Sequence, residues 1–274
     1  MDAREIRTRI LAALIGGPVV LIMAYFGRSF FVLIMNIIIG FSVWEFYQFA
    51  EKRGYAPSRI TGTGLVLLFS WFLALFRGRF VLLALLAVVL IVLIEALFKA
   101  QRNPLINASI TLLGFLYISL FNAFVFLREA GSPLYWNYAT GGWLVISIFI
   151  SIWICDSTAY FFGSRFGKHL LFKRVSPAKT WEGALAGLLA ALITASLLLS
   201  RLSGFNWIDG IVFGLIIGVA GPVSDLVESL FKRDAGVKDS SSLIPGHGGM
   251  LDRFDSPLFI GPLILLYLLA TRII

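Results

Sequence analysis

The sequence predicts an all-α polytopic membrane protein, a helix bundle with about nine transmembrane helices, and two observations favour this fold. Hydrophobic residues make up 59% of the 274 residues and charged residues only 14%, against roughly 25% charged in an ordinary soluble domain. The apolar residues also fall into runs close to the roughly 20 residues that a helix needs to cross a bilayer. A soluble enzyme, a disordered protein and a nucleic-acid-binding module are therefore excluded, because too little polar surface remains to cover the apolar side chains.

Nine apolar runs divide the chain. They are residues 10–26, 30–50, 60–76, 80–98, 105–127, 141–162, 183–202, 210–231 and 257–274. No long linker or low-complexity segment separates them, so we expect one integral membrane domain over residues 1–274. Within it, residues 1–140 hold the first five helices, and residues 141–274 hold four catalytic helices with two polar loops.

The basic residues predict the orientation. The formal net charge is +8, and Lys and Arg are enriched in the cytoplasmic loops of membrane proteins. The N-terminus and the loops after the second, fourth, sixth and eighth runs hold 17 of the 23 basic residues. We therefore expect a cytoplasmic N-terminus, an external C-terminus, and both long polar loops on the cytoplasmic side.

Five carboxylates lie within apolar runs: Glu45, Glu95, Asp156, Asp225 and Glu228. An ionised group at mid-bilayer costs about 2.5–3.5 kcal/mol even on insertion scales, so such groups are functional candidates. For Glu45 and Glu95 we favour the simpler interpretation that terminal carboxylates reach the interface or pair with loop lysines.

Asp225 follows a stripe of small residues. Gly210, Gly214 and Gly218 recur every four residues, a spacing that lets helices approach closely in lipid. Asp225 lies two helical turns beyond Gly218 and shares its face. The sequence thus predicts that Asp225 points into the bundle.

The loop after residues 210–231 is the richest in polar groups. With Ser229 at the end of that run, it offers Lys232, Arg233, Lys238, Asp239, Gly246, His247, Gly248, Gly249, Asp252, Arg253 and Asp255. Lys and Arg bind phosphate oxygens, and glycines let backbone N–H groups approach an anion. Carboxylates three residues apart beside such cations fit a magnesium–nucleotide site.

Each of these residues also has a structural alternative. Lys232 and Arg233 could mark the cytoplasmic end of a helix, and Asp255 could cap the helix that Pro257 opens. The glycines could serve turns, and His247 could be a structural hydrogen-bonding group. All of these structural explanations would have to be true at once within one short loop. We therefore favour the interpretation as a magnesium–nucleotide site.

The loop after residues 141–162 is a weaker candidate. It follows Asp156 and carries Lys168, Ser176, Lys179 and Thr180. Ser176 or Thr180 is placed to cap the next helix. A lysine near a helix N-terminus is slightly unfavourable by dipole, so Lys179 makes more sense if an anion binds there.

The string from Ser229 to Asp255 resembles the signature of the phosphatidate cytidylyltransferases, also called CDP-diacylglycerol synthases. The pattern Ser-x2-Lys-Arg-x4-Lys-Asp, then Pro-Gly-His-Gly-Gly-x2-Asp-Arg-x-Asp, is matched at every fixed position. The stretch from Ser176 to Gly183 resembles a second shared segment, although Ala178 stands where many members have a basic residue. The first five helices resemble the family only in being hydrophobic.

The resemblance implies a metal-dependent transferase of phospholipid biosynthesis that acts in the bilayer with its active site facing the cytoplasm. CTP and phosphatidic acid would give CDP-diacylglycerol and pyrophosphate, with Mg²⁺ as cofactor and no nucleic-acid partner; a second cation and a homodimer are left open. It implies metal ligands at Asp225, Asp252 and Asp255. The implied catalytic set adds Lys232, Arg233, Lys238, Asp239, His247 and Arg253, and the implied substrate-binding set is Asp156, Lys168, Ser176, Lys179, Thr180, Ser229, Gly246, Gly248 and Gly249.

Two other classes of membrane protein fit the sequence less well. The CDP-alcohol phosphotransferases also use clustered aspartates and Mg²⁺, but their Asp-Gly-x2-Ala-Arg opening is absent from this sequence. A transporter or flippase of an anionic lipid would show internal repeats and helices broken at the midplane, and the sequence indicates neither.

The topology is testable with reporters. A reporter fused after Ile274 should lie outside the membrane and one fused at Lys173 inside it, because the charge bias places these points on opposite sides. Reporter activity in intact cells measures both, and finding the two fusions on the same side would contradict nine crossings.

Overall fold

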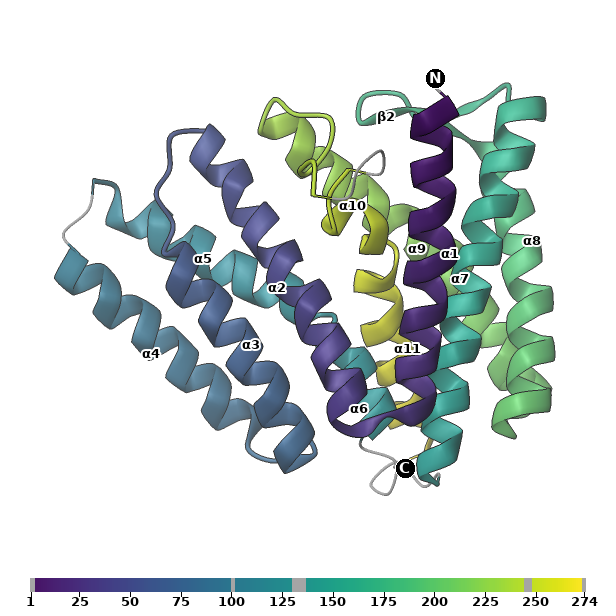
Figure 1. The fold of residues 1–274 in the computed structure, drawn as a ribbon, viewed down its shortest axis with the longest axis horizontal. Helices are drawn as coiled ribbons and strands as arrows, with labels where there is room; N and C mark the ends of the chain where they lie inside the picture. Colours follow the sequence, from purple (N-terminus) through teal and green to yellow (C-terminus); the bar gives the residue numbers. More distant parts are fainter. Residues whose placement is uncertain (1–2, 100–101, 130–136, 244–247, 273–274) are drawn as a thin grey trace. The chain divides into compact units, whose positions relative to one another are not determined.

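The computed structural model describes residues 3–99, 102–129, 137–243 and 248–272, and most of them are helical (Figure 1). The elements are α1 (Ala3–Phe26), α2 (Arg28–Lys52), α3 (Arg59–Phe76), α4 (Val81–Lys99), α5 (Pro104–Ser119), α6 (Asn122–Glu129), α7 (Tyr138–Phe166), β1 (Leu170–Phe172), β2 (Ser176–Thr180), α8 (Trp181–Leu198), the π-helical turn η2 (Leu199–Ser203), α9 (Trp207–Asp234), α10 (Leu251–Phe254) and α11 (Pro257–Arg272).

Eight helical segments among the described residues are long and apolar enough to cross a membrane. They are Arg28–Lys52, Arg59–Phe76, Val81–Lys99, Pro104–Glu129, Tyr138–Phe166, Trp181–Ser203, Trp207–Asp234 and Leu251–Thr271. The shorter apolar helix Ile15–Phe26 belongs to α1 and coincides with the first predicted run. The all-α membrane fold is thereby confirmed, and every predicted run falls on a helix.

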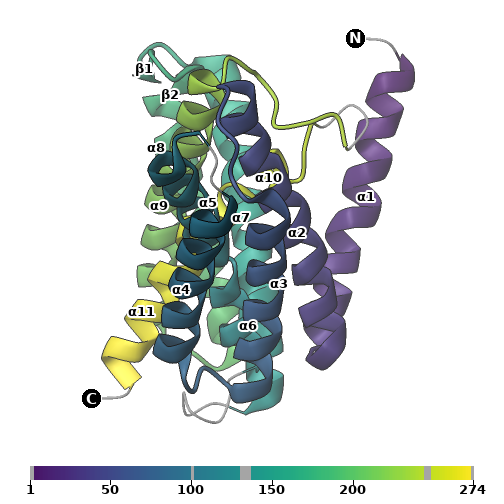
Figure 2. The same ribbon diagram turned by 90° about the vertical axis from the view of Figure 1, so that its left-hand side faces the viewer.

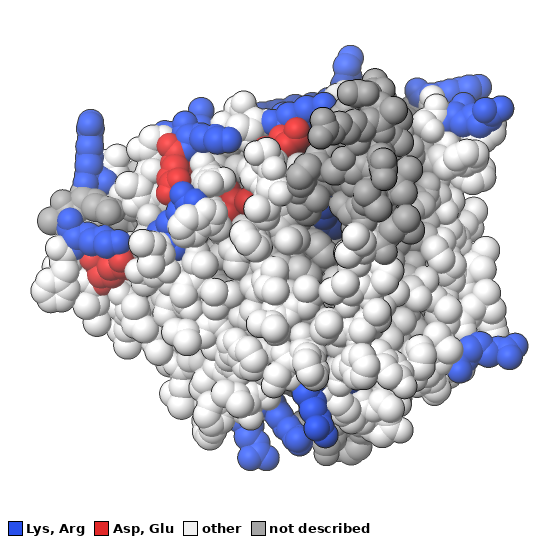
Figure 3. Space-filling view, in the orientation of Figure 1, with Lys and Arg blue, Asp and Glu red and all other residues white. Residues whose placement is uncertain are grey.

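The surface of these helices is itself apolar. On α4, Leu97 is 75% exposed and Phe98 is 80% exposed. Figure 3 shows a face that is mostly free of charged side chains. Such a surface is stable when lipid tails rather than water cover it, so the protein is an integral membrane protein.

The chain forms two compact units. The first comprises Met1–Val20, Arg28–Phe126 and Phe231–Phe254, and the second comprises Leu21–Gly27, Leu127–Leu230 and Asp255–Ile274. In the first unit α3 packs against α2, α4 and α5, and Figure 2 shows α2 beside α3. In the second unit α7 packs along α8 (Figure 1).

Two local features depart from the predicted pattern. The loop after α7 contains an antiparallel hairpin in which Leu170 pairs with Thr180 and Phe172 with Ser176. The run 105–127 is interrupted between α5 and α6, at Leu120 and Phe121. Neither Gly nor Pro marks that interruption in the sequence.

The predicted glycine stripe packs α9 against α8. A Cβ atom at Gly214 would lie 2.5 Å from Leu192 Cα and 3.0 Å from the Ala191 carbonyl oxygen. A Cβ atom at Gly210 would likewise lie too close to Ser196, and one at Gly218 too close to Leu188. Backbone atoms cannot rotate aside as side chains do, so these glycines set how closely the two helices approach.

Replacing Gly214 should therefore destabilise the second unit. We expect Gly214→Ala to lower the free energy of unfolding by about 1–3 kcal/mol, the usual cost of overpacking, visible as a lower Tm in detergent. Gly64→Ala on α3 is the matched control, because no atom lies within 4 Å of a Cβ built there. Equal Tm values for the two variants would contradict this account of the stripe.

Candidate active site

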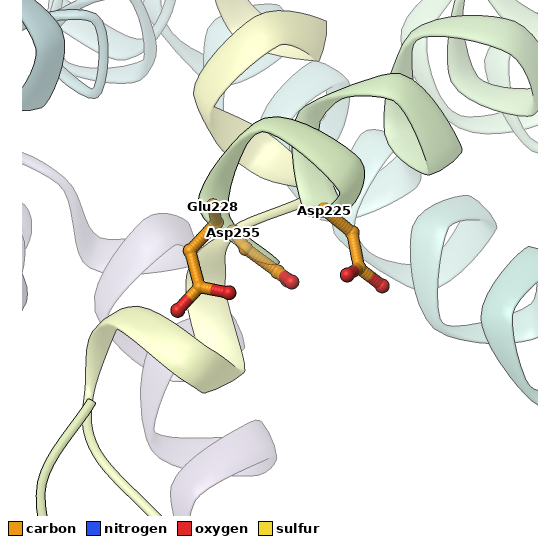
Figure 4. A group of neighbouring side chains, drawn as sticks. All are labelled: Asp225, Glu228 and Asp255. Carbon is orange, nitrogen blue, oxygen red and sulfur yellow. The ribbon is translucent and has the colours of Figure 1, made fainter. Parts of the chain in front are cut away.

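Three carboxylates cluster in the second unit. Asp225, Glu228 and Asp255 each offer an oxygen, and these oxygens all lie within 4.8 Å of one another. Figure 4 shows the three side chains pointing to the same side, two from α9 and one from the segment that leads into α11. Glu228 is fully buried, while Asp225 and Asp255 are half-buried.

Local structure explains how the cluster forms. Asp225 and Glu228 are three residues apart on a helix and so lie on one face. Ser224 is buried and donates its hydroxyl to the Asp255 carbonyl at 2.6 Å, which ties the start of α11 to α9. The Ser256 N–H donates to Asp255 Oδ1 at 2.7 Å. Two elements distant in sequence thus bring three acidic groups together.

The loop after α7 reaches this cluster through Lys179. The Lys179 ammonium forms an ion pair with the Asp225 carboxylate, and both side chains are about one quarter exposed. Ser229 donates its hydroxyl to Asp225 Oδ1 at 3.2 Å. Asp156 on α7 interacts electrostatically with Asp225, with Lys179 and with the Ser256 hydroxyl. The predicted residues Asp156, Lys179, Asp225, Ser229 and Asp255 therefore lie together.

The charge balance of this cluster favours a cation. Among the described residues, the carboxylates of Asp156, Asp225, Glu228 and Asp255 lie near one another, and the Lys179 ammonium group is the cation that interacts with Asp156, Asp225 and Asp255. Like charges held this close repel, and the repulsion disfavours ionisation. Carboxylate oxygens are the ligands that Mg²⁺ prefers in proteins. The donor set therefore fits a divalent metal ion.

A second set of predicted residues lies in the first unit. Lys232 is 9% exposed, and its ammonium group lies 2.6 Å from Asp252 Oδ1. Asp252 Oδ2 accepts hydrogen bonds from the Ser240 N–H and from the Gly249 N–H, both at 2.8 Å. A buried carboxylate needs such partners, and Asp252 has three: the Lys232 ammonium group and the N–H groups of Ser240 and Gly249. The role of Asp252 as a metal ligand stays a prediction.

The glycines of this loop are required by its geometry. Gly248 has a φ of +84°, which a side chain would strain. A Cβ atom at Gly249 would collide with Ser240 Oγ and with the Glu45 carboxylate. Their substrate-binding roles remain predictions, and Gly246 and His247 lie outside the described residues.

The other predicted residues lie in the hairpin after α7, where Thr180 is buried, and around the second set, where they are exposed. Thr180 caps α8, because its hydroxyl accepts the Gly183 N–H at 3.2 Å, which confirms one of the two predicted caps. Ser176 begins β2, and Lys168 is exposed at the start of the hairpin. Arg233, Lys238, Asp239 and Arg253 are exposed side chains around the second set.

Sequence reasoning gave no site role to Glu228 or Glu45, although it named both among the carboxylates of the apolar runs. Glu228 lies one turn from Asp225 in the same apolar run, so the helical spacing was a usable signal. Glu45 was interpreted as an interfacial carboxylate, and that interpretation is wrong: its side chain is 2% exposed and accepts hydrogen bonds from Ser240 and Ser241. Glu95 pairs with Lys99 as expected.

The chain is similar to a described protein family and to named bacterial proteins. A sequence profile described as the cytidylyltransferase family matches residues 7–271. A phosphatidate cytidylyltransferase from Staphylococcus aureus (strain COL) is 36% identical over 221 residues, which are 78% of this chain and 80% of that protein. One from a Synechocystis strain is 33% identical over 281 residues, 93% of this chain and 94% of that protein. One from Haemophilus influenzae is 49% identical over 121 residues, 42% of each chain.

The matched region includes both the acidic cluster and the Lys232–Asp252 pair. Since the profile spans nearly the whole sequence and two relatives above 30% identity cover most of it, the chain belongs to the cytidylyltransferase family.

Proposed function

We propose that the protein transfers the cytidylyl group of CTP to phosphatidic acid and releases pyrophosphate. The observation that carries the proposal is the cluster of Asp225, Glu228 and Asp255 beside Lys179. A metal-binding carboxylate cluster next to an ammonium group suits a substrate with several phosphates. The relatives that bear the name phosphatidate cytidylyltransferase support the same activity.

The proposed reaction needs positioning more than activation of a nucleophile. A phosphate oxygen of phosphatidic acid forms a bond to the α-phosphorus of CTP while the bond to the β-phosphate breaks. That oxygen is already anionic near neutral pH, so no activated Ser or Cys is required. The protein must hold two anions in line, which calls for cations and fixed geometry.

We assign the acidic cluster to Mg²⁺. Asp225 and Asp255 are the principal candidates, and Glu228 joins them because its oxygens lie within the same 4.8 Å group. A bound Mg²⁺ would supply positive charge against the triphosphate and the departing pyrophosphate. Asp252 is kept only as an alternative ligand, because it is not part of that 4.8 Å group and both of its oxygens already accept hydrogen bonds from the protein.

In this proposal the basic residues bind the phosphate groups of the substrates. Lys179 lies at the acidic cluster, and Arg233, Lys238 and Arg253 are exposed enough to meet a soluble nucleotide. Phosphatidic acid resides in the leaflet, so a site at the cytoplasmic ends of the helices is within its reach. We accordingly place the active site on the cytoplasmic side.

Release of pyrophosphate tests the function and the metal ligands together. With CTP, Mg²⁺ and phosphatidic acid, the wild-type chain should release pyrophosphate. Asp225→Asn and Asp255→Asn should lose at least tenfold in rate, about 1.4 kcal/mol of transition-state stabilisation, because they keep the shape of the side chain and remove its charge. Asp234→Asn, an exposed residue at the end of α9, is the matched control.

A magnesium titration separates the candidate ligands. Glu228→Gln should raise the Mg²⁺ concentration needed for half-maximal rate, whereas Asp252→Asn should lower the rate and leave that concentration close to the wild-type value. The opposite pattern would restore Asp252 as the ligand and remove Glu228.

Lys179 tests whether the loop after α7 binds substrate. Lys179→Gln removes a charge-assisted bond worth roughly 1.5–3 kcal/mol, so kcat/KM should fall about tenfold or more. Lys173→Gln, an exposed lysine in the turn of the same hairpin, is the control and should keep wild-type kinetics. If Lys179→Gln and Asp156→Asn both retain full activity, this loop is only a connector.

A further inference from the structure

Glu45 lies on α2 and binds both ends of the loop that leads into α10. Its Oε1 accepts the Ser241 hydroxyl at 2.6 Å and the Met250 N–H at 2.9 Å. Its Oε2 accepts the Ser240 hydroxyl at 2.8 Å and the Leu251 N–H at 2.8 Å. One carboxylate therefore joins residues 240 and 241 to residues 250 and 251.

The same loop ends hold the Lys232–Asp252 pair. Ser240, which binds Glu45, also donates its N–H to Asp252 at 2.8 Å. Gly249 donates its N–H to Asp252 as well, and it has no room for a side chain because Glu45 and Ser240 lie against it. The position of Asp252, and through it that of Lys232, thus depends on contacts that Glu45 makes.

Burying the Glu45 carboxylate costs free energy that a neutral side chain would not cost, so its charge should have a specific role. A carboxylate out of water must recover its lost hydration through hydrogen bonds, and four donors do so here. A purely apolar contact between α2 and the loop would avoid that cost. The negative charge of Glu45 instead selects one arrangement of four donors, which is what a precisely placed loop requires.

We infer that Glu45 is a positioning residue for the proposed cytidylyl transfer, acting by fixing the loop ends that hold Asp252 and Lys232. This role rests on the proposed function. It is distinct from metal binding, because Glu45 contacts backbone and hydroxyl donors, and it requires no contact with a substrate.

The isosteric amide is a sharp probe of this role. In glutamine one of the two oxygens becomes an NH₂ donor. Whichever way the amide is turned, that NH₂ faces the N–H of Met250 or of Leu251, and a backbone N–H cannot accept. A serine hydroxyl can reverse its role, but the backbone cannot. Glu45→Gln must therefore lose one of the two backbone hydrogen bonds at residues 250 and 251 while keeping its volume.

The experiment compares purified full-length wild type, Glu45→Gln and Glu95→Gln. Glu95 is the matched control, since it is a carboxylate within a span of the same unit and pairs with Lys99 and Thr61. Pyrophosphate release gives kcat and KM for CTP, and thermal unfolding gives the folded fraction. We expect kcat/KM of folded Glu45→Gln to fall at least tenfold, mainly through kcat, while Glu95→Gln stays within twofold of wild type.

Several results would overturn the inference. Kinetics of folded Glu45→Gln within twofold of wild type, or a rate loss fully explained by loss of folded protein, would leave Glu45 a structural residue only. If Glu45→Gln does not fold, Ser241→Ala replaces it, because it removes one donor and keeps both backbone bonds; it should lower kcat at least threefold, and wild-type kinetics would count against the role. An inactive wild-type chain would instead remove the proposed function itself.

Discussion

A carboxylate placed among apolar helices loses its hydration, and the partners that replace the lost water organise both units of this protein. Without such partners the group would neutralise or the helix would leave the membrane. In the first unit the partners of Glu45 and Asp252 are hydroxyls, backbone N–H groups and Lys232. In the second unit they include Lys179, Ser229 and Ser256.

The two units meet this requirement in different ways. The carboxylates of the first unit have donors from the protein itself, so their geometry is set by folding. Asp225, Glu228 and Asp255 instead lie close to one another, an arrangement that mutual repulsion opposes and a cation stabilises. An enzyme that joins two negatively charged substrates needs groups of fixed geometry and a site that binds cations. The first unit supplies the former and the acidic cluster of the second unit suits the latter.

Much of the fold could be predicted because the bilayer imposes a length. The apolar runs are helical, with residues 105–127 divided between α5 and α6, and the stripe at Gly210, Gly214 and Gly218 packs as its spacing indicates. The hairpin Leu170–Phe172 with Ser176–Thr180 was missed, since strands of three and five residues are too short to establish an alternating pattern.

The candidate site was predictable in part for a related reason. Motif residues that lie near one another in sequence, such as Lys232 and Asp252 or Asp225 and Ser229, were found as a group and do make contacts. Glu45 was not, because its partners lie about two hundred positions along the chain. Only a folded structure can reveal a pair separated in that way, since no local periodicity connects the two segments.

The hydroxyl of Ser240 lies 2.8 Å from Glu45 Oε2 and 2.9 Å from Asp252 Oδ2. A hydroxyl carries a single proton, so at any instant it can satisfy only one of these two acceptors. Rotation about one side-chain bond is enough to transfer that hydrogen bond from one carboxylate to the other. A single rotation of the Ser240 side chain would therefore exchange this hydrogen bond between α2 and Asp252 without any movement of the backbone.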